Sequence, residues 1–181
     1  RESKQVLTGA IDQVAEAISE GRDTVQGLRS STLEANTLAD SLRVLAEELA
    51  KERDSGTSAR VEVHGAPREL HPIVRDEAFR VVGEALRNAI KHSHARQIAV
   101  TIHYEPRQLR LVIRDDGTGI DAEALAARQA AGHFGLPGMR ERAAIVKGQL
   151  DVRSERDAGT EIELRVAART AYRAQGTSSS M

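Results

Sequence analysis

Hydrophobic positions recur along residues 1–30 at alternating steps of four and three. They are Leu7, Ile11, Val14, Ile18, Val25 and Leu28, with Gly21 in the one gap. This spacing predicts a helix over 3–29 and is typical of a coiled coil or helical bundle. An amphipathic helix packed on its own domain shows a similar pattern, so both interpretations stay open. A second helix follows, with an apolar face made by Leu38, Leu42, Leu45 and Leu49.

After residue 56 the pattern changes to short alternating runs separated by turn residues and by two further helical stretches. The expected strands lie around 61–63, 98–102, 109–113, 150–152 and 162–166, and the expected helices over 72–92 and 137–146. Short connections within each of the last two strand pairs predict antiparallel hairpins. The order predicts an α/β fold of the α+β two-layer kind, in which helices cover one face of a mixed, mostly antiparallel sheet.

Composition narrows the classes of function. The chain has 26 basic and 27 acidic residues, only two Phe and two Tyr, and no Trp. It therefore has neither the basic field nor the row of aromatic rings expected of a nucleic-acid binder. The absence of cysteine excludes disulfides, thiolate zinc sites and cysteine nucleophiles. No apolar run approaches the roughly 20 residues that span a bilayer.

Three groups of residues carry candidate chemistry. The first is a stripe on the helix over 72–92, formed by Glu84, Asn88, Lys91 and His92. A polar stripe is most often the solvated face of a helix. Asparagine, however, is a mediocre helix former, and its carbonyl is a hard oxygen ligand suited to Mg²⁺.

The second group follows directly after a strand, at Asp115, Asp116, Gly117 and Gly119. A dinucleotide-binding glycine motif is excluded because two carboxylates would repel a pyrophosphate and the strand belongs to a hairpin. The spacing does not match a calcium-binding loop either. The third group is the glycine-rich run at 132–138, which leads into a helix. Its backbone N–H groups could hold a phosphate, or its glycines could be ordinary turn residues of a loop.

Together the three groups resemble, in type and order, the sequence boxes of the GHKL ATPases. Within them they resemble the histidine kinase catalytic domain of the subfamily that drives LuxR/NarL-type response regulators. The matching stretches are Glu84-x-x-x-Asn88-x-x-Lys91-His92, Asp115-x-Gly117-x-Gly119, Gly135-Leu136-Pro137-Gly138-Met139-Arg140-Glu141-Arg142-Ala143 and Gly159-Thr160. The resemblance covers about residues 70–167 and implies the Bergerat (GHKL) version of the α/β fold.

The resemblance gives each matched position a role in binding ATP and Mg²⁺. Asp115 is expected to accept a hydrogen bond from the adenine amino group, with Thr160 supporting it. Gly117 and Gly119 would let the backbone approach the base. The backbone N–H groups expected to hold the phosphates are those near Gly135, Leu136 and Gly138.

The helical stripe receives the remaining roles. Asn88 is the expected Mg²⁺ ligand, Lys91 and His92 would neutralise phosphate charge, and Glu84 would be catalytic by polarising the nucleophile. That nucleophile is expected on a helix preceding this chain, since none of the six histidines stands in the matching context. The fragment should therefore bind ATP without phosphorylating itself.

The resemblance also implies an organisation in three parts. Residues 1–31 would be the second helix of a truncated dimerisation domain, 32–168 the ATP-binding domain and 169–181 a disordered tail. The implied partners are a LuxR/NarL-type response regulator and, in the full protein, a second copy bound through the N-terminal helix. The expected setting is the cytoplasmic portion of a membrane-anchored bacterial sensor, attached to the membrane only through a missing N-terminal part.

Two alternatives remain beside this hypothesis. Another GHKL member, such as an anti-sigma serine kinase or a MutL-like ATPase, is disfavoured by the heptad helix and by the run Met139-Arg140-Glu141-Arg142. A degenerate relative would serve only as a dimerisation or regulator-docking module. Against it stand Asn88 and Asp115, costly polar residues that a decayed site should lose first. Failure to bind nucleotide would favour it.

Overall fold

A computed structural model describes residues 37–52, 56–120 and 135–173. Internal contacts divide the chain into two units, Arg1–Thr37 and Leu38–Met181, and every element described below belongs to the second. The helix predicted over 3–29 lies outside the described residues, as do residues 132–134 of the glycine-rich run at 132–138. Among the residues that are described, none forms a helix long and apolar enough to cross a membrane.

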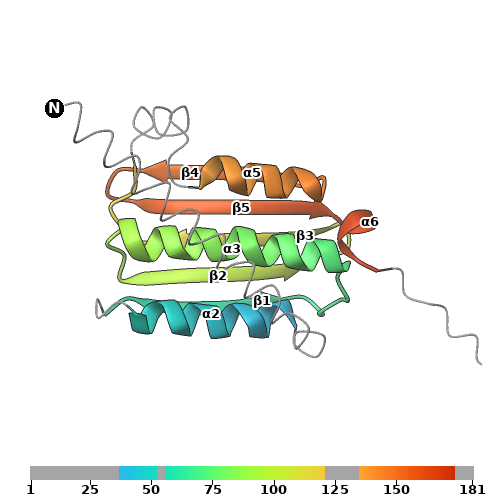
Figure 1. Cartoon of the computed structure of the whole chain (residues 1–181), viewed down its shortest axis with the longest axis horizontal. Helices are drawn as coiled ribbons and strands as arrows, with labels where there is room; N and C mark the ends of the chain where they lie inside the picture. The colour runs from blue at the N-terminus through green and yellow to red at the C-terminus, as the bar shows by residue number, and fades with distance from the viewer. Residues whose placement is uncertain (1–36, 53–55, 121–134, 174–181) are drawn as a thin grey trace, which may run out of the picture. The chain divides into compact units, whose positions relative to one another are not determined.

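The second unit is built on one five-stranded sheet (Figure 1). Its strands are β1 (Ser58–His64), β2 (Gln97–Tyr104), β3 (Gln108–Asp115), β4 (Gln149–Glu155) and β5 (Gly159–Ala167). They are ordered β1-β2-β3-β5-β4, with β1 parallel to β2 and the other neighbours antiparallel. Both predicted hairpins are therefore confirmed, and the sheet is mixed and mostly antiparallel, as expected.

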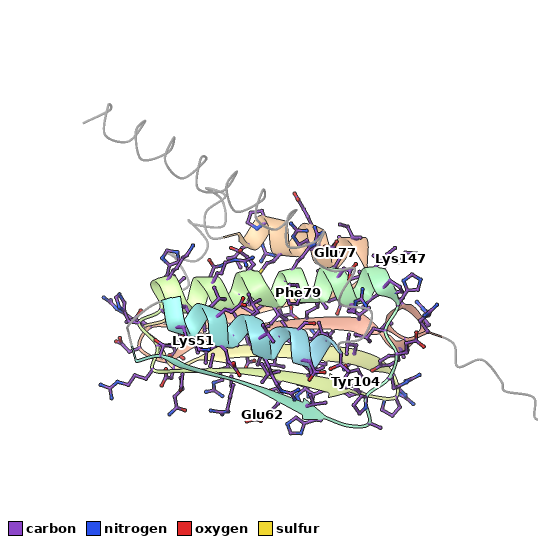
Figure 2. The ribbon with its side chains drawn as sticks, turned by 60° about the horizontal axis from the view of Figure 1, so that its bottom comes forward. Lys51, Glu62, Glu77, Phe79, Tyr104 and Lys147 are labelled. Atoms are coloured by element: carbon purple, nitrogen blue, oxygen red, sulfur yellow. The ribbon has the colours of Figure 1, made fainter. Side chains whose placement is uncertain are left out.

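Three helices lie on one face of this sheet: α2 (Leu38–Glu52), α3 (Pro72–His92) and α5 (Leu136–Ile145). The face beneath them is apolar, because alternate residues of β2, β3 and β5 are buried there. The residues between them face the open side and include several charged ones, such as Arg110, Glu163 and Arg165. Glu62 of β1 points away from the helices in Figure 2. Period-two patterning thus places the whole core on one side of the sheet. The two-layer α/β fold is confirmed.

Helix α3 is the central helix of that layer. Pro72 stands in its first turn, where a missing N–H costs nothing, so the start predicted from the sequence is confirmed. The helix ends at His92, and the next residue, Ser93, caps it by donating its N–H to the Ala89 carbonyl at 3.1 Å. Its buried residues include Val81, Val82 and Leu86, which contribute to the core over the sheet. The polar stripe predicted on α3 is therefore anchored by a fixed buried face.

The chain continues to pack beyond the boundary expected at residue 168. A short helix, α6 (Ala168–Ala171), is followed by Tyr172, which is buried against Tyr104 and lies beneath the Arg68 guanidinium. The Tyr172 hydroxyl lies 3.1 Å from the Glu105 carbonyl oxygen and 2.8 Å from that of Gln108. Residues 169–173 are therefore part of the folded unit. Because the tail is mostly polar, the packing of the Tyr172 ring could not be predicted from its sequence.

Candidate nucleotide-binding site

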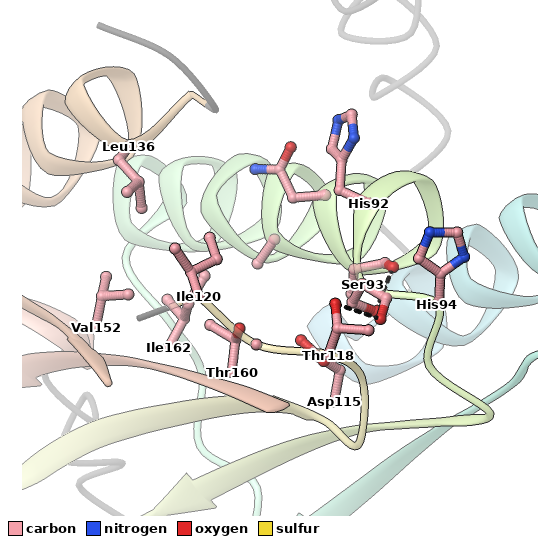
Figure 3. Close-up of a pocket in the computed structure, with 14 residues that line it drawn as sticks. His92, Ser93, His94, Asp115, Thr118, Ile120, Leu136, Val152, Thr160 and Ile162 are labelled. Atoms are coloured by element: carbon pink, nitrogen blue, oxygen red, sulfur yellow. Dashed lines mark hydrogen bonds between the residues drawn. The ribbon is translucent and has the colours of Figure 1, made fainter. Parts of the chain in front are cut away.

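A pocket of about 290 Å³ opens where the end of α3 meets the end of β3 and the beginning of β5 (Figure 3). Its lining combines an apolar wall with a few converging polar groups, as expected of a small-molecule site. The lining residues are Ala85, Asn88, Ala89, His92, Ser93, His94, Asp115, Thr118, Gly119, Ile120, Leu136, Val152, Thr160 and Ile162. Residues from separate stretches of the sequence thus surround one cavity.

Asp115 supplies the buried carboxylate of the pocket. The residue is only 6% exposed, and its Oδ1 accepts a hydrogen bond from the Gly117 N–H at 2.9 Å. Burial raises the pKa of Asp115, and hydrogen bonds from the Gly117 N–H, the Ser93 side chain and the Thr160 backbone act in the opposite direction. The carboxylate is thus desolvated and oriented, able to discriminate between a hydrogen-bond donor and an acceptor on a ligand.

The neighbouring carboxylate, Asp116, is used differently. Its Oδ1 accepts hydrogen bonds from the backbone N–H groups of Arg96 and Gln97, each at 2.8 Å. These N–H groups belong to the turn that enters β2. Asp116 therefore joins the end of β3 to the start of β2 and does not line the pocket. The acidic pair therefore divides into one residue that lines the pocket and one that has a structural role.

The loop after Asp115 is held from both sides. Thr118 donates from its backbone N–H to the Ser93 carbonyl at 2.8 Å, and its own carbonyl accepts from Asp157 N–H at 2.7 Å. The Ile120 N–H donates to the Ser154 hydroxyl at 2.8 Å. The end of α3 and the β4–β5 hairpin thus fix the loop. Sequence reasoning missed these anchors, because their only signal is proximity to the recognised motifs.

Two glycines predicted for this loop are required by close approach. A Cβ on Gly117 would overlap the Ser93 carbonyl oxygen and lie 2.8 Å from Asp115 Oδ1. Gly119 has φ +59°, and a Cβ there would overlap the Glu155 carbonyl oxygen. No side chain fits either position without displacing backbone. Gly119 lines the pocket, whereas Gly117 lies directly behind the carboxylate.

The predicted stripe on α3 is divided between the pocket and its surroundings. Asn88 and His92 line the cavity, and Lys91 is exposed next to them. Glu84 lies one turn earlier and does not line it; its carboxylate pairs with Arg87 at 3.3 Å and packs against Gly135. The four residues lie on one face of α3, but only Asn88 and His92 line the pocket.

The start of α5 forms another wall. Leu136 is buried at the pocket, following Gly135, which has φ +62° and would overlap Glu84 if it carried a Cβ. Gly138 lies in the first turn of α5, and a Cβ there would meet nothing within 4 Å. A helix N-terminus with glycines beside a polar cavity is a favourable place for an anion.

Thr160 completes the predicted set from β5. It lies opposite Asp115 in the β3–β5 register, and its hydroxyl is 2.9 Å from the Ser154 hydroxyl. Among the described residues, no cluster of three His, Cys, Asp or Glu side chains could hold a metal ion by itself. A cation here would rely on the Asn88 amide oxygen together with ligand oxygens and water, a coordination that suits Mg²⁺.

Comparison with known proteins identifies the family. Residues 73–170 match the model described as histidine kinase-, DNA gyrase B-, and HSP90-like ATPase. The chain is 32% identical over 151 residues to the sensor histidine kinase LiaS of Bacillus subtilis (strain 168), covering 83% of this chain and 40% of LiaS. It is 26% identical over 91 residues to the sensor histidine kinase YdfH of the same organism, covering 50% of this chain and 22% of YdfH. The chain thus spans less than half the length of these relatives.

Solved structures share the fold. The histidine kinase domain of the blue-light activated histidine kinase from Erythrobacter litoralis EL346 superposes with a TM-score of 0.58 at 20% identity, covering 71% of this chain and 60% of that one. A longer structure of the same kinase gives a TM-score of 0.59 at 19% identity, over 76% of this chain and 44% of that one. The chain belongs to the histidine kinase-, DNA gyrase B- and HSP90-like ATPase family, with an ATPase domain of the histidine kinase type.

Proposed function

We propose that this chain is the ATP-binding catalytic part of a two-component sensor histidine kinase. The observation that carries the proposal is the pocket itself, which gathers Asn88, Asp115, Gly119 and Thr160 from three separate sequence motifs around one cavity. Nucleotide recognition explains their conjunction, because the site offers a buried acceptor at one end and a hard oxygen ligand on its wall.

Asp115 would select the base. An ionised carboxylate accepts a hydrogen bond from the 6-amino group of adenine, whereas guanine presents a carbonyl oxygen at the same position and would be repelled. A site built to hydrogen-bond one group rejects the analogue lacking it, because its buried polar atoms are left unpaired. Thr160, paired with Asp115 across β3 and β5, would support the carboxylate.

The phosphates would extend from the base along α3 toward α5. Asn88 would contribute its amide oxygen to Mg²⁺, which when bound neutralises phosphate charge. His92, which lines the pocket, and Lys91, which is exposed beside it, would add positive charge. The N–H groups at the start of α5, near Gly135, Leu136 and Gly138, would hold the terminal phosphates.

The transfer step itself would need the phosphoacceptor histidine of the full kinase. A nitrogen of that imidazole attacks the γ-phosphorus, the bond to the β–γ bridging oxygen breaks, and ADP leaves with the electron pair. Glu84 would polarise the nucleophile and take up its proton once separated from Arg87. The phosphoryl group would then pass to an aspartate of a LuxR/NarL-type response regulator. Residues 1–31 would help the full, membrane-anchored protein to dimerise.

Titration calorimetry with ATP and Mg²⁺ tests the proposal. We expect micromolar-range binding, about 8 kcal/mol, by the wild-type chain. GTP should not bind, and the Asp115→Asn variant should no longer bind ATP. Asp116→Asn is the matched control, because an amide oxygen can still accept the hydrogen bonds from Arg96 and Gln97. A folded wild-type chain that binds neither nucleotide would instead support a degenerate docking module.

A further inference from the structure

A short row of polar side chains crosses the otherwise apolar side of the sheet at the pocket. Ser154 of β4 is in register with Thr160 of β5, and Thr160 is in register with Asp115 of β3. The next residues on the same face of these strands are apolar: Val152, Ile162 and Ile113. Polar side chains are costly on a face that packs against helices, so this row indicates a role beyond packing.

Among the described residues, the Ser154 hydroxyl contacts three polar groups. Its oxygen accepts a hydrogen bond from the Ile120 N–H at 2.8 Å, and its proton is donated to the Gly159 carbonyl at 3.1 Å. The third partner is the Thr160 hydroxyl, at 2.9 Å. A hydroxyl has one proton and two lone pairs, and the Ser154 proton is used at Gly159. The proton between the two hydroxyls therefore comes from Thr160.

This order of hydrogen bonds makes Thr160 an acceptor toward the pocket. Because the Thr160 proton points to Ser154, its oxygen has only lone pairs to offer a ligand. Thr160 lines the cavity, and Figure 3 draws it with Asp115 on the strand side, below α3. Thr160 contacts Asp115 through its backbone N–H, so its hydroxyl is not used there. The strand side of the pocket therefore presents two acceptors in adjacent register positions.

We propose that Ser154 is a positioning residue for the purine 6-amino group: it takes the Thr160 proton and so keeps the Thr160 oxygen as a second acceptor beside the Asp115 carboxylate. The proposal rests on the proposed function, because it assumes that an adenine base reaches Asp115. Residues in antiparallel register have Cβ atoms roughly 5 Å apart. An amino group can bridge two acceptors at that separation, because its N–H bonds diverge by about 120° and each hydrogen bond is about 2.9 Å long.

A structural role is the competing explanation for Ser154. Its hydrogen bond from the Ile120 N–H anchors the loop after β3, and Ser154 itself does not line the pocket. The two roles differ in what they need. Positioning of an acceptor requires the Thr160 hydroxyl, whereas anchoring of the loop does not. Removing the Thr160 hydroxyl therefore separates the two roles in a double-mutant cycle.

The test measures nucleotide affinities of the wild-type chain, Ser154→Ala, Thr160→Val and the double variant. The ligands are ATP and purine riboside triphosphate, which carries hydrogen in place of the 6-amino group and is otherwise the same. We expect Ser154→Ala to lower the ratio of ATP affinity to analogue affinity about fivefold, as fits one hydrogen bond, because the Thr160 proton can then turn toward the ligand. In the Thr160→Val background, Ser154→Ala should leave this ratio unchanged, because the acceptor is already gone.

Two further variants control for the fold. Ser154→Thr keeps the hydroxyl and should retain the wild-type ratio. Ser154→Cys fills a similar space with a weak acceptor, so it should lower the ratio and provides the test if Ser154→Ala does not fold. If the loss is equal for both nucleotides, or persists without the Thr160 hydroxyl, Ser154 only anchors the loop and the inference is wrong. A folded wild-type chain that binds neither nucleotide overturns the proposed function first, which is a distinguishable result.

Discussion

Asp115 and Asp116 are adjacent in the chain, yet their carboxylates lie in different environments and make different contacts. Asp115 is buried at the pocket and is oriented by the Gly117 N–H, whereas Asp116 is exposed and binds the backbone N–H groups of Arg96 and Gln97. Asp115 is the last residue of β3 and faces the buried side of the sheet, whereas Asp116 is the first residue after the strand. Asp115 lines the pocket, and Asp116 connects the end of β3 to the start of β2.

Asp115→Asn should stabilise the protein while abolishing ATP selection. Because burial raises the folded-state pKa of Asp115, ionising it costs stability as the pH rises through that pKa, and the cost persists at neutral pH. An amide removes this cost, so we expect a gain of about 1 kcal/mol in the unfolding free energy near neutral pH, a typical gain for relieving a strained functional site. Denaturant unfolding measures it. The gain should vanish in acid, and a loss of stability at neutral pH would contradict the argument.

Asp116→Ala should instead destabilise the protein and have a smaller effect on ATP binding. Two hydrogen bonds to backbone N–H groups disappear, and we expect a loss of about 1–2 kcal/mol in the unfolding free energy. ATP affinity, measured under conditions where the variant stays folded, should change less than for Asp115→Asn. A variant as stable as the wild type would show that water replaces the carboxylate at Arg96 and Gln97.

Gly119 and Gly138 should respond differently to alanine. Gly119→Ala meets a positive φ and the Glu155 carbonyl, so we expect a loss of at least about 2 kcal/mol of stability. Gly138→Ala meets open space within α5, where alanine favours the helix, and should gain about 0.5–1 kcal/mol. If phosphates approach that turn, Gly138→Ala should also weaken ATP binding. Calorimetry beside thermal unfolding separates the two effects, and unchanged affinity would move the phosphates away from Gly138.

Tyr172→Phe should destabilise the domain without affecting the pocket. The lost hydroxyl bridges the carbonyls of Glu105 and Gln108, and its removal should cost about 1 kcal/mol. The β2–β3 register puts this turn at the opposite end of the strands from Asp115, so ATP affinity should hold. Arg169→Ala, exposed on α6, is the control and should stay within about 0.5 kcal/mol. Equal stability of Tyr172→Phe and wild type would mean that ring packing alone anchors the chain end.

The sequence by itself determined the five strands, the main helices and several of the residues that line the pocket. Periodicity marks which face of a segment is buried, so the helix beginning at Pro72 and the two hairpins could be predicted from local patterns. Asn88, Asp115, Gly119 and Thr160 stand in recognisable motifs, and the structure brings them to one cavity. Their individual roles toward ATP remain predictions.

Only the tertiary structure decided which groups meet across the chain. Burial of Tyr172, the structural use of Asp116, the pairing of Glu84 with Arg87 and the contact of Ser93 with the loop after β3 carry no local signature. Each depends on a hydrogen bond or a packing contact between segments whose separation in space the sequence pattern does not encode. The hydrophobic periodicity of a segment specifies which face a residue occupies, whereas the packing of the layers determines which residues it contacts.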